Sequence, residues 1–221
     1  MISTFFFDMD GVLFDTETEV AQILKNDCVD RFGYHFSDDL LNRCLGRSYN
    51  DCRKLYLDEF GEGFPFTEVW SYCAQRIREK ADNGTLTQKP GVRSLLSMLQ
   101  ENKIPCILVT SNGSRQARFL LERSGLLPFF QEIIGGESVA EGKPAPDIYL
   151  KALERTGADP KKTIVIEDSV QGVSAALSAG LSVVMVPDRV KPDAEMQKAC
   201  TACVSSLSDV LPALKEKGLW S

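Results

Sequence analysis

The chain has 221 residues, of which 43% are hydrophobic and 25% are charged, and its formal net charge is −6. This composition is typical of a globular protein with room for one large domain, or for a core and a smaller second domain. The acidic balance and the lack of a basic block argue against nucleic acid as a partner, and no apolar run is long enough to span a membrane. Because no secretory signal is visible at the N-terminus, we expect a cytoplasmic protein.

Seven cysteines and a single histidine restrict the kinds of site that the chain can build. An odd number of cysteines without a leader favours reduced thiols. Cys200 and Cys203 form a lone C-x-x-C, which we interpret as small buried residues rather than as a metal or redox site. His35 falls in an expected loop and is interpreted as a surface residue, so a zinc site built from several histidines is not expected.

The first predicted element is a short buried strand, because Phe5-Phe6-Phe7 is an apolar aromatic run. From residue 16 to about 85 the pattern is helical, without a strand. Its first helix is predicted to begin at the capping box Thr16–Glu19 and to end at Gly33. Two further helices are predicted after Ser37 and Ser48. A fourth carries apolar residues at helical spacing, namely Val69, Trp70, Cys73, Ile77 and Ala81.

From Pro90 onward, short apolar runs alternate with helical patterns. Strands are predicted at 104–109, 132–134, 163–166 and 182–186, with helices before, between and after them. This alternation is typical of βαβ units and a parallel sheet. The predicted fold class is therefore α/β: a Rossmann-like parallel-sheet core of residues 1–15 and 88–221, interrupted by an all-helical cap domain of residues 16–87. The two crossings, near Asp15-Thr16 and Thr87–Pro90, are predicted to be hinges.

Carboxylates follow two of the predicted strands. Asp8 and Asp10 end the first strand, and Glu167-Asp168 ends the strand at 163–166. Ligands collect at the carboxyl ends of parallel strands, and adjacent carboxylates are costly unless a cation such as Mg²⁺ neutralises them. An ordinary turn or helix N-cap explains each pair taken alone. Gly172, inside the helix that follows, indicates a close backbone approach to a neighbour.

Two other loops suit a phosphate group. Thr110-Ser111-Asn112 follows a strand and enters a helix, which offers backbone N–H groups to an anion, although a plain N-cap explains the same residues. Lys143 precedes Pro144, which keeps the lysine out of the helical region. A lysine held there is a point charge for a phosphate, and a solvated loop lysine is the alternative.

In this order, these residues resemble the haloacid dehalogenase superfamily, specifically its phosphatase and β-phosphoglucomutase-like branch with a helical cap after the first strand. The resemblance covers nearly the whole chain. The family's first motif is matched by Asp8-Met9-Asp10-Gly11-Val12, its second by Thr110, its third by Lys143 and its fourth by Glu167-Asp168. The dehalogenases that gave the family its name lack the second acid, so the presence of Asp10 favours the phosphatases.

The resemblance implies a two-step phosphoryl transfer. Asp8 would be the nucleophile that forms an aspartyl-phosphate, and Asp10 the general acid and then the general base. Mg²⁺ would be held by Asp8, the backbone carbonyl of Asp10 and Asp168, with Glu167 behind them. The phosphoryl oxygens would be bound by Thr110, Ser111, Asn112 and Lys143.

Substrate specificity would come from the cap. Arg47, before the third helix, and Arg76 or Lys80, on the fourth, are the candidate contacts, with Arg115 as a weaker one. A solvated surface arginine is the alternative for Arg47. The mutases of this branch carry a histidine near position 20, where this chain has Val20.

The sequence therefore predicts a Mg²⁺-dependent phosphatase that acts on a small-molecule phosphate ester, a sugar phosphate being one candidate. The alternatives are a hexose-phosphate mutase and, from another class, a non-catalytic binding protein on the same fold. No feature indicates an oligomer, so a monomer is the default expectation.

Overall fold

The computed structural model describes residues 1–220 and contains one six-stranded parallel sheet in the order β3-β2-β1-β4-β5-β6. The strands are β1 (Thr4–Phe7), β2 (Cys106–Thr110), β3 (Phe130–Gly135), β4 (Thr163–Glu167), β5 (Ser182–Met185) and β6 (Ala202–Cys203). The first strand of the chain is central, between β2 and β4. The predicted α/β fold with a parallel sheet is confirmed, and this order places the ends of β1, β2 and β4 beside one another.

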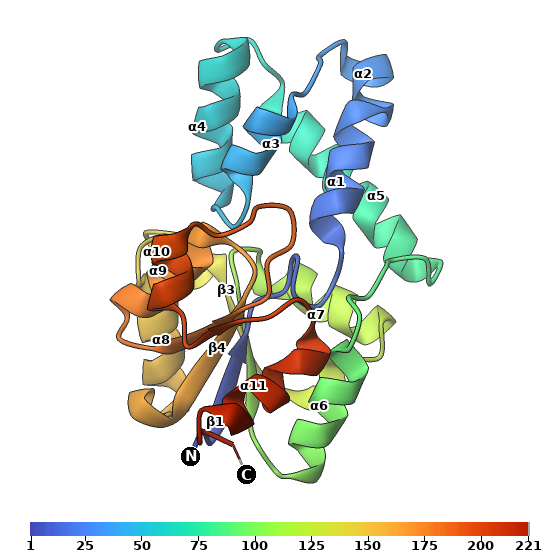
Figure 1. Ribbon diagram of the computed structural model, residues 1–221. Helices are drawn as coiled ribbons and strands as arrows, with labels where there is room; N and C mark the ends of the chain where they lie inside the picture. Colours follow the sequence, from blue (N-terminus) through green and yellow to red (C-terminus); the bar gives the residue numbers. More distant parts are fainter. Residues whose placement is uncertain (221) are drawn as a thin grey trace.

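Helices cover both faces of the sheet (Figure 1). One layer contains α6 (Val92–Glu101), α7 (Ser114–Arg123) and α11 (Val210–Glu216), and the other contains α8 (Asp147–Thr156), α9 (Val170–Ser178) and α10 (Ala194–Ala199). Because alternate strand residues point to opposite faces, Phe5 and Phe7 pack in the first layer while Phe6 packs in the second. Two elements, α10 and β6, were not predicted from the sequence, because they are only six and two residues long.

Between β1 and α6 the chain forms five helices, α1 (Thr16–Lys25), α2 (Asp27–Phe32), α3 (Asp38–Cys44), α4 (Tyr49–Phe60) and α5 (Phe66–Asp82). We call residues 16–87 the helical insertion and the remainder the core. The insertion stands over the carboxyl end of the sheet, and the two termini lie at the opposite end (Figure 1). Its interior is rich in aromatic side chains. Tyr56 and Phe64 contact each other, and both contact Phe60 and Phe66.

Two helix predictions in this region need correction. The single helix expected from Thr16 to Gly33 is two helices, α1 and α2, which meet at Asn26, where φ is −107° and ψ is −72°. The capping box at Thr16 does not form: the N-cap residue of α1 is Asp15, without a side-chain cap, and the Thr16 hydroxyl bonds to Asp10 instead. The caps at Ser37 and Ser48 are present, each accepting a hydrogen bond from a backbone N–H three residues on.

The two chain crossings between the core and the insertion lie side by side. Phe14 and Gln88 form a β-bridge, and the Asp15 N–H donates to the Thr87 carbonyl at 2.9 Å. Lys89 adds an ion pair to Asp188 at 2.6 Å and approaches Asp15 at 3.6 Å. The two crossings are therefore joined by backbone hydrogen bonds and by the attraction between Lys89 and Asp15.

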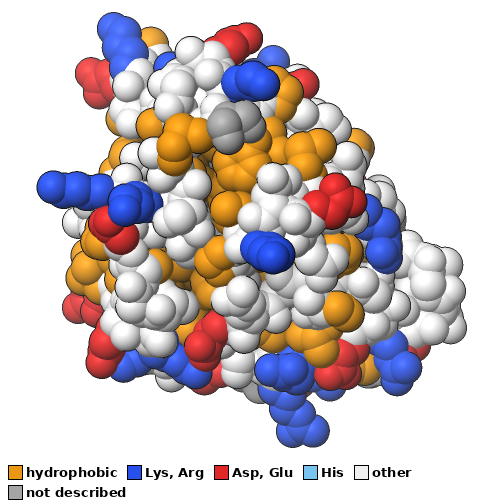
Figure 2. Space-filling model, turned by 90° about the horizontal axis from the view of Figure 1, so that it is seen from below, with side chains coloured by type: hydrophobic (Ala, Val, Ile, Leu, Met, Phe, Trp, Pro, Cys, Tyr) orange, Lys and Arg blue, Asp and Glu red, His pale blue; other side chains and the backbone are white. Residues whose placement is uncertain are grey.

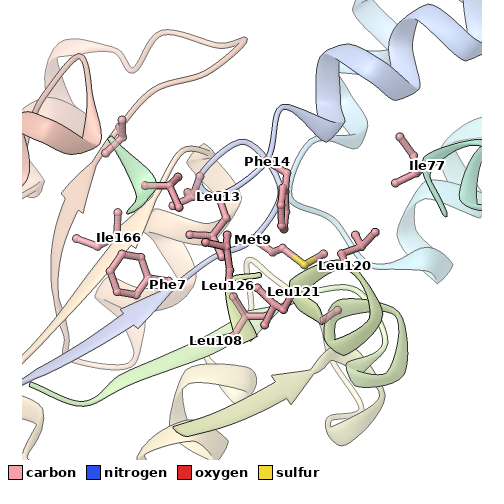
Figure 3. Packing of buried hydrophobic residues seen from close by; sticks show 14 of the residues in the cluster. Phe7, Met9, Leu13, Phe14, Ile77, Leu108, Leu120, Leu121, Leu126 and Ile166 are labelled. Carbon is pink, nitrogen blue, oxygen red and sulfur yellow. The ribbon is translucent and has the colours of Figure 1, made fainter. Parts of the chain in front are cut away.

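Beneath the loop after β1, a dry apolar layer supports the site. Met9, Leu13 and Phe14 turn down from this loop toward Leu120 and Leu121 of α7 (Figure 3). All five are nearly or fully inaccessible to solvent. Such close packing fixes the loop that carries the two aspartates.

The surface of the core mixes charged and apolar side chains. On the face seen from below, basic and acidic side chains are interspersed with apolar ones (Figure 2). Within residues 1–220, none of the helices is long and apolar enough to cross a membrane. His35 is exposed as predicted, and Cys200 is buried, but Cys203 is exposed, so the prediction of two buried residues is wrong for Cys203.

Candidate active site

Asp8 and Asp168 follow two adjacent strands, which brings them together. Phe7 pairs with Ile166 in the parallel ladder, and the Asp8 N–H donates to the Ile166 carbonyl at 3.0 Å. Carboxylate oxygens of Asp8, Glu167 and Asp168 all lie within 4.8 Å of one another. The sheet topology thus assembles three buried acids from chain positions 160 residues apart, and such a cluster is a candidate cation site.

Lys143 is the basic partner of these acids. Its ammonium donates to Asp8 Oδ1 at 2.7 Å and to Glu167 Oε1 at 2.6 Å, and its side chain is only 1% exposed. Burial alone would lower the pKa of this lysine, but the facing Asp8 and Glu167 charges raise it well above its ordinary value. The solvated-loop alternative is therefore wrong, and the charge is directed at the carboxylates.

Glu167 holds this arrangement in place with both of its oxygens. Besides Lys143, the Tyr149 hydroxyl donates to Oε1 at 2.8 Å, and the Asp168 N–H donates to Oε2 at 3.1 Å. Gly172 is required beside it, because a Cβ there would collide with the Glu167 carboxylate. The close approach predicted for Gly172 is confirmed. Since the oxygens of Glu167 are occupied, Asp8 and Asp168 are the acids left to face a cation.

Asp10 points to a different set of partners. The Thr16 hydroxyl donates to Oδ1 at 2.5 Å and the Asn112 side-chain amide donates to Oδ2 at 2.6 Å. Burial raises the pKa of Asp10, and these two hydrogen bonds oppose the rise. Within residues 1–220, the backbone carbonyl of Asp10 accepts no hydrogen bond and so remains available to a ligand.

The segment after β2 lies beside both aspartates. Thr110 is fully buried and its hydroxyl accepts from the Asn112 N–H at 3.1 Å. The Ser111 hydroxyl donates to the Gly46 carbonyl of the insertion at 3.0 Å. Ser111 and Asn112 thus face the space above Asp8, whereas Thr110 supports them from behind.

The acid cluster carries more negative charge than Lys143 offsets. Burial, opposed by Lys143, raises the pKa of Asp8 to about 8, and burial and the neighbouring acids raise that of Asp168 well above its ordinary value. Gly11, with φ of +73°, makes room for the Asp168 carboxylate, because a Cβ at position 11 would collide with that carboxylate. A bound divalent cation would compensate this charge, and the donor set of oxygens suits Mg²⁺.

A cavity of about 440 Å³ lies between the acids and the insertion. Asp8, Asp10, Ser111 and Asn112 line its core side. Its volume is typical of small-molecule sites. Asp8 and Asp10 are thus accessible from a space that can hold a ligand.

The two arginines predicted to contact substrate differ in position. Arg47 lines the cavity, and its Nε donates to the Arg43 carbonyl at 2.8 Å. The prediction for Arg76 needs correction: this residue is not part of the lining and pairs with Asp27 and Glu79 at 3.0 and 2.9 Å. Arg78, two residues on, lines the cavity instead.

Of the other candidates, Lys80 pairs with Glu19 at 2.9 Å and Arg115 is exposed, and neither lines the cavity.

Three residues near the site were missed from the sequence. Glu17 lines the cavity, and burial together with Asp10 and Asp8 raises its pKa to about 8. Arg189, from the loop after β5, also lines the cavity and donates to Asp38 of the insertion at 3.2 Å. Tyr149 reaches Glu167 from α8. Nothing in the local pattern of these residues distinguishes them from ordinary surface or core residues, because their roles depend on segments far away in the chain.

Comparison with known proteins agrees with this geometry. The sequence profile described as haloacid dehalogenase-like hydrolase matches residues 5–186. The chain belongs to this family. All four of the family's motifs, from Asp8 to Asp168, fall within the matched residues.

Curated relatives resemble most of the chain. A phosphorylated carbohydrates phosphatase of Thermotoga maritima is 33% identical over 79% of this chain and 80% of its own length. A probable pseudouridine-5'-phosphatase of Drosophila melanogaster is 32% identical over 93% of this chain and 90% of its own. A solved structure, a putative β-phosphoglucomutase from Thermotoga maritima, is 30% identical with a TM-score of 0.75, covering 97% of this chain and 99% of that one.

Proposed function

We propose that the protein is a Mg²⁺-dependent phosphatase that hydrolyses a small phosphorylated metabolite through an aspartyl-phosphate on Asp8. The observation that carries the proposal is the convergence of Asp8, Asp168 and the Lys143–Glu167 pair at the carboxyl ends of β1 and β4, beneath a cavity of about 440 Å³. Relatives named as phosphatases support the reaction class.

The residues present fit a magnesium ion. Asp8 Oδ2, the free backbone carbonyl of Asp10 and the Asp168 carboxylate would hold it, and Glu167 would act only through Lys143 and the backbone. When bound, the ion supplies positive charge that offsets the phosphoryl oxygens and keeps Asp8 and Asp168 ionised. Three carboxylates facing one ammonium support this assignment, because the imbalance disappears with a divalent cation.

The side chains then divide the chemistry. Asp8 attacks phosphorus, a new Asp8–phosphorus bond forms and the bond to the leaving oxygen breaks. Asp10, protonated at this step, gives its proton to the leaving oxygen. In the second step a water molecule attacks the aspartyl-phosphate, Asp10 takes its proton, and free phosphate leaves with Asp8 restored. Burial favours the protonated Asp10 that the first step needs.

The phosphoryl oxygens require donors on the core side of the cavity. Ser111 and Asn112 line it directly, and Lys143 provides positive charge from below Asp8. Thr110 orders this segment through its bond to the Asn112 N–H. We propose that these residues neutralise charge that develops during transfer.

We propose that the helical insertion, residues 16–87, is a cap domain that closes over the substrate, with hinges at the two crossings. The contact from Ser111 to the Gly46 carbonyl and that from Arg189 to Asp38 support a closed arrangement. Closure of this kind excludes water from the reacting phosphate.

A hexose-phosphate mutase is the second candidate, because a putative β-phosphoglucomutase is 30% identical over nearly the whole chain. Position 20 argues against it. Val20 lines the cavity where the resemblance leads one to expect a histidine, and an aliphatic side chain cannot carry a proton. We therefore prefer hydrolysis.

The deciding experiment measures phosphate release from p-nitrophenyl phosphate with Mg²⁺ and with a chelator. Turnover that needs Mg²⁺ supports the proposal, and a wild type inactive at every pH tested would favour a non-catalytic binding protein. A hexose 1-phosphate is then supplied and products are separated. Faster accumulation of the 6-phosphate than of free phosphate would establish the mutase instead.

A further inference from the structure

We infer that the cavity above Asp8 accepts a phosphate ester whose leaving group carries a planar ring, in preference to one whose leaving group is a carbohydrate alone. The inference rests on the proposed phosphatase function and names the substrate class of the same site. It follows from the character of the cavity wall that the helical insertion provides.

That wall is apolar and aromatic. The cavity that begins at Asp8 and Asp10 reaches the interior of the insertion, where its lining includes Leu24, Leu41, Tyr56, Phe66, Val69 and Trp70. An unfilled apolar cavity costs stability in proportion to its volume, because its lining loses contacts. A wall of this composition is therefore suited to an apolar body that enters it.

The aromatic rings of the wall form a connected group. Phe66 lies 5.3 Å from Tyr56 and 5.5 Å from Trp70, measured between ring centroids, and Tyr49 lies 5.3 Å from Trp70. Rings at mixed tilts present both faces and edges, and planar groups gain from both kinds of contact. A flat ring fits such a wall better than a puckered, hydroxyl-rich one.

Polar partners are too few to hold a carbohydrate deep in the cavity. They gather at the boundary between the core and the insertion, and two of the cations there already have partners: Arg78 donates to Gln116 at 2.5 Å and Arg189 donates to Asp38 at 3.2 Å. A sugar hydroxyl buried without a partner costs free energy. A sugar can therefore lie at the boundary between the core and the insertion, but the apolar space inside the insertion does not suit a second sugar.

One polar group of the aromatic wall is open to the cavity and available to the ring. The Tyr56 side chain is largely buried and lines the cavity, and its hydroxyl makes no hydrogen bond within residues 1–220. Burial raises its pKa further above the ordinary range, so it is a neutral donor and acceptor. A ring nitrogen or carbonyl oxygen would satisfy this group, which favours a heteroaromatic ring such as a nucleobase.

The test compares substrates that differ only by the ring. Uridine 5'-monophosphate and adenosine 5'-monophosphate are each compared with ribose 5-phosphate in the presence of Mg²⁺. We expect kcat/KM for at least one nucleotide to exceed that for ribose 5-phosphate by about tenfold or more, because the ring adds buried apolar contact. A higher kcat/KM for ribose 5-phosphate than for both nucleotides would overturn the inference while leaving the phosphatase function intact. No turnover of any ester would refute the function itself.

A matched pair of variants locates the ring. Ala74→Leu adds bulk to the cavity wall, whereas Gln75→Leu adds the same side chain at an exposed neighbour on α5. We expect Ala74→Leu to lower the nucleotide-to-ribose ratio of kcat/KM by about tenfold, and Gln75→Leu to leave the ratio unchanged. Equal ratios in both variants would place the ring elsewhere.

A binding measurement adds a readout that needs no turnover. Trp70 lines the cavity, whereas the second tryptophan, Trp220, packs on Phe5 at the other end of the core. Uridine, without phosphate, should quench the fluorescence of the protein, and ribose should not. The quench should disappear in Trp70→Phe. A quench that persists in that variant would contradict the assignment.

Discussion

The core and the helical insertion meet at Asp8 and fill their interiors in opposite ways. Below Asp8, the core buries charged and polar groups, and Lys143 and Glu167 satisfy one another with Tyr149 and backbone N–H groups. Above it, the insertion buries aromatic and aliphatic side chains around a cavity and leaves the Tyr56 hydroxyl without a partner. In the first interior Lys143, Glu167 and Tyr149 satisfy one another, and the charge that remains on Asp8 and Asp168 suits a cation. Within residues 1–220, the second interior offers an apolar wall with a single free hydroxyl.

The difference indicates that the core positions the reacting groups and that the insertion selects the substrate. A fully satisfied polar network is rigid, and rigidity holds a nucleophile and its charge partners in position. An apolar wall selects by shape and by the cost of unpaired polar groups, so it discriminates between leaving groups without affecting the reacting atoms. Changes in the core should therefore affect every substrate, and changes in the insertion only some.

The largest effect is expected from Asp8→Asn, which removes the carboxylate that we propose as the nucleophile. We expect kcat to fall by at least about 10⁴-fold for every phosphate ester tested, because the covalent step is lost. Steady-state kinetics measures it, and circular dichroism checks that the variant is folded. A variant that retains the parental rate would eliminate Asp8 as the nucleophile.

Lys143→Met tests the charged interior. Removing the ammonium leaves Asp8 and Glu167 buried without a counter-charge, and we expect the free energy of unfolding to fall by about 3–5 kcal/mol. Urea denaturation provides the measurement. The control is Lys151→Met, whose exposed ion pair with Glu154 should be worth less than about 1 kcal/mol. An equal loss of unfolding free energy in the two variants would show that the buried network stabilises the fold no more than an exposed ion pair does.

The dependence of Mg²⁺ binding on pH tests the same interior without mutation. The pKa of Asp8 is about 8 in the folded protein and 3.8 ordinarily. Between pH 3.8 and about pH 8, Asp8 is therefore protonated in the folded, metal-free protein and ionised in the unfolded chain. The stability of the metal-free protein should therefore fall as pH rises across this window, and Mg²⁺ must displace the proton to bind. We expect the increase in Tm caused by Mg²⁺ to be larger at about pH 8 than at about pH 5.5. An increase that is the same at both pH values would be inconsistent with a cation on Asp8.

The smallest effect concerns the contact between the two regions. Gly46 of the insertion has φ of +69°, and a Cβ there would collide with the Ser169 hydroxyl of the core. Gly46→Ala should lower kcat/KM by roughly 10- to 100-fold, because displacement of the closed insertion misplaces the substrate. Gly33→Ala is the matched control, with φ of +76° but no atom within 4 Å of its Cβ. It should carry the same backbone strain and leave kcat/KM unchanged, and if the two variants behave alike, strain alone is responsible.

The core part of the site could be predicted from the sequence because its residues are fixed by local signals. Asp8, Thr110 and the Glu167-Asp168 pair each end an apolar run that predicts a strand, and in a parallel sheet all strands end at the same edge. Gly172 was interpretable for the same reason, since a glycine within a helix marks a close neighbour. The sequence by itself thus determined the α/β fold and the residues that gather at its carboxyl edge.

Only the tertiary structure decided what those residues touch. Lys143 was predicted as a charge for phosphate, but its ammonium lies on Asp8 and Glu167 because a loop far away in the chain brings it there. Arg76 and Arg78 lie on one helix and point about 200° apart at 100° per residue, so the packing of α5 decides which one faces the cavity. Such contacts depend on how elements are placed in space, and no local pattern encodes that placement.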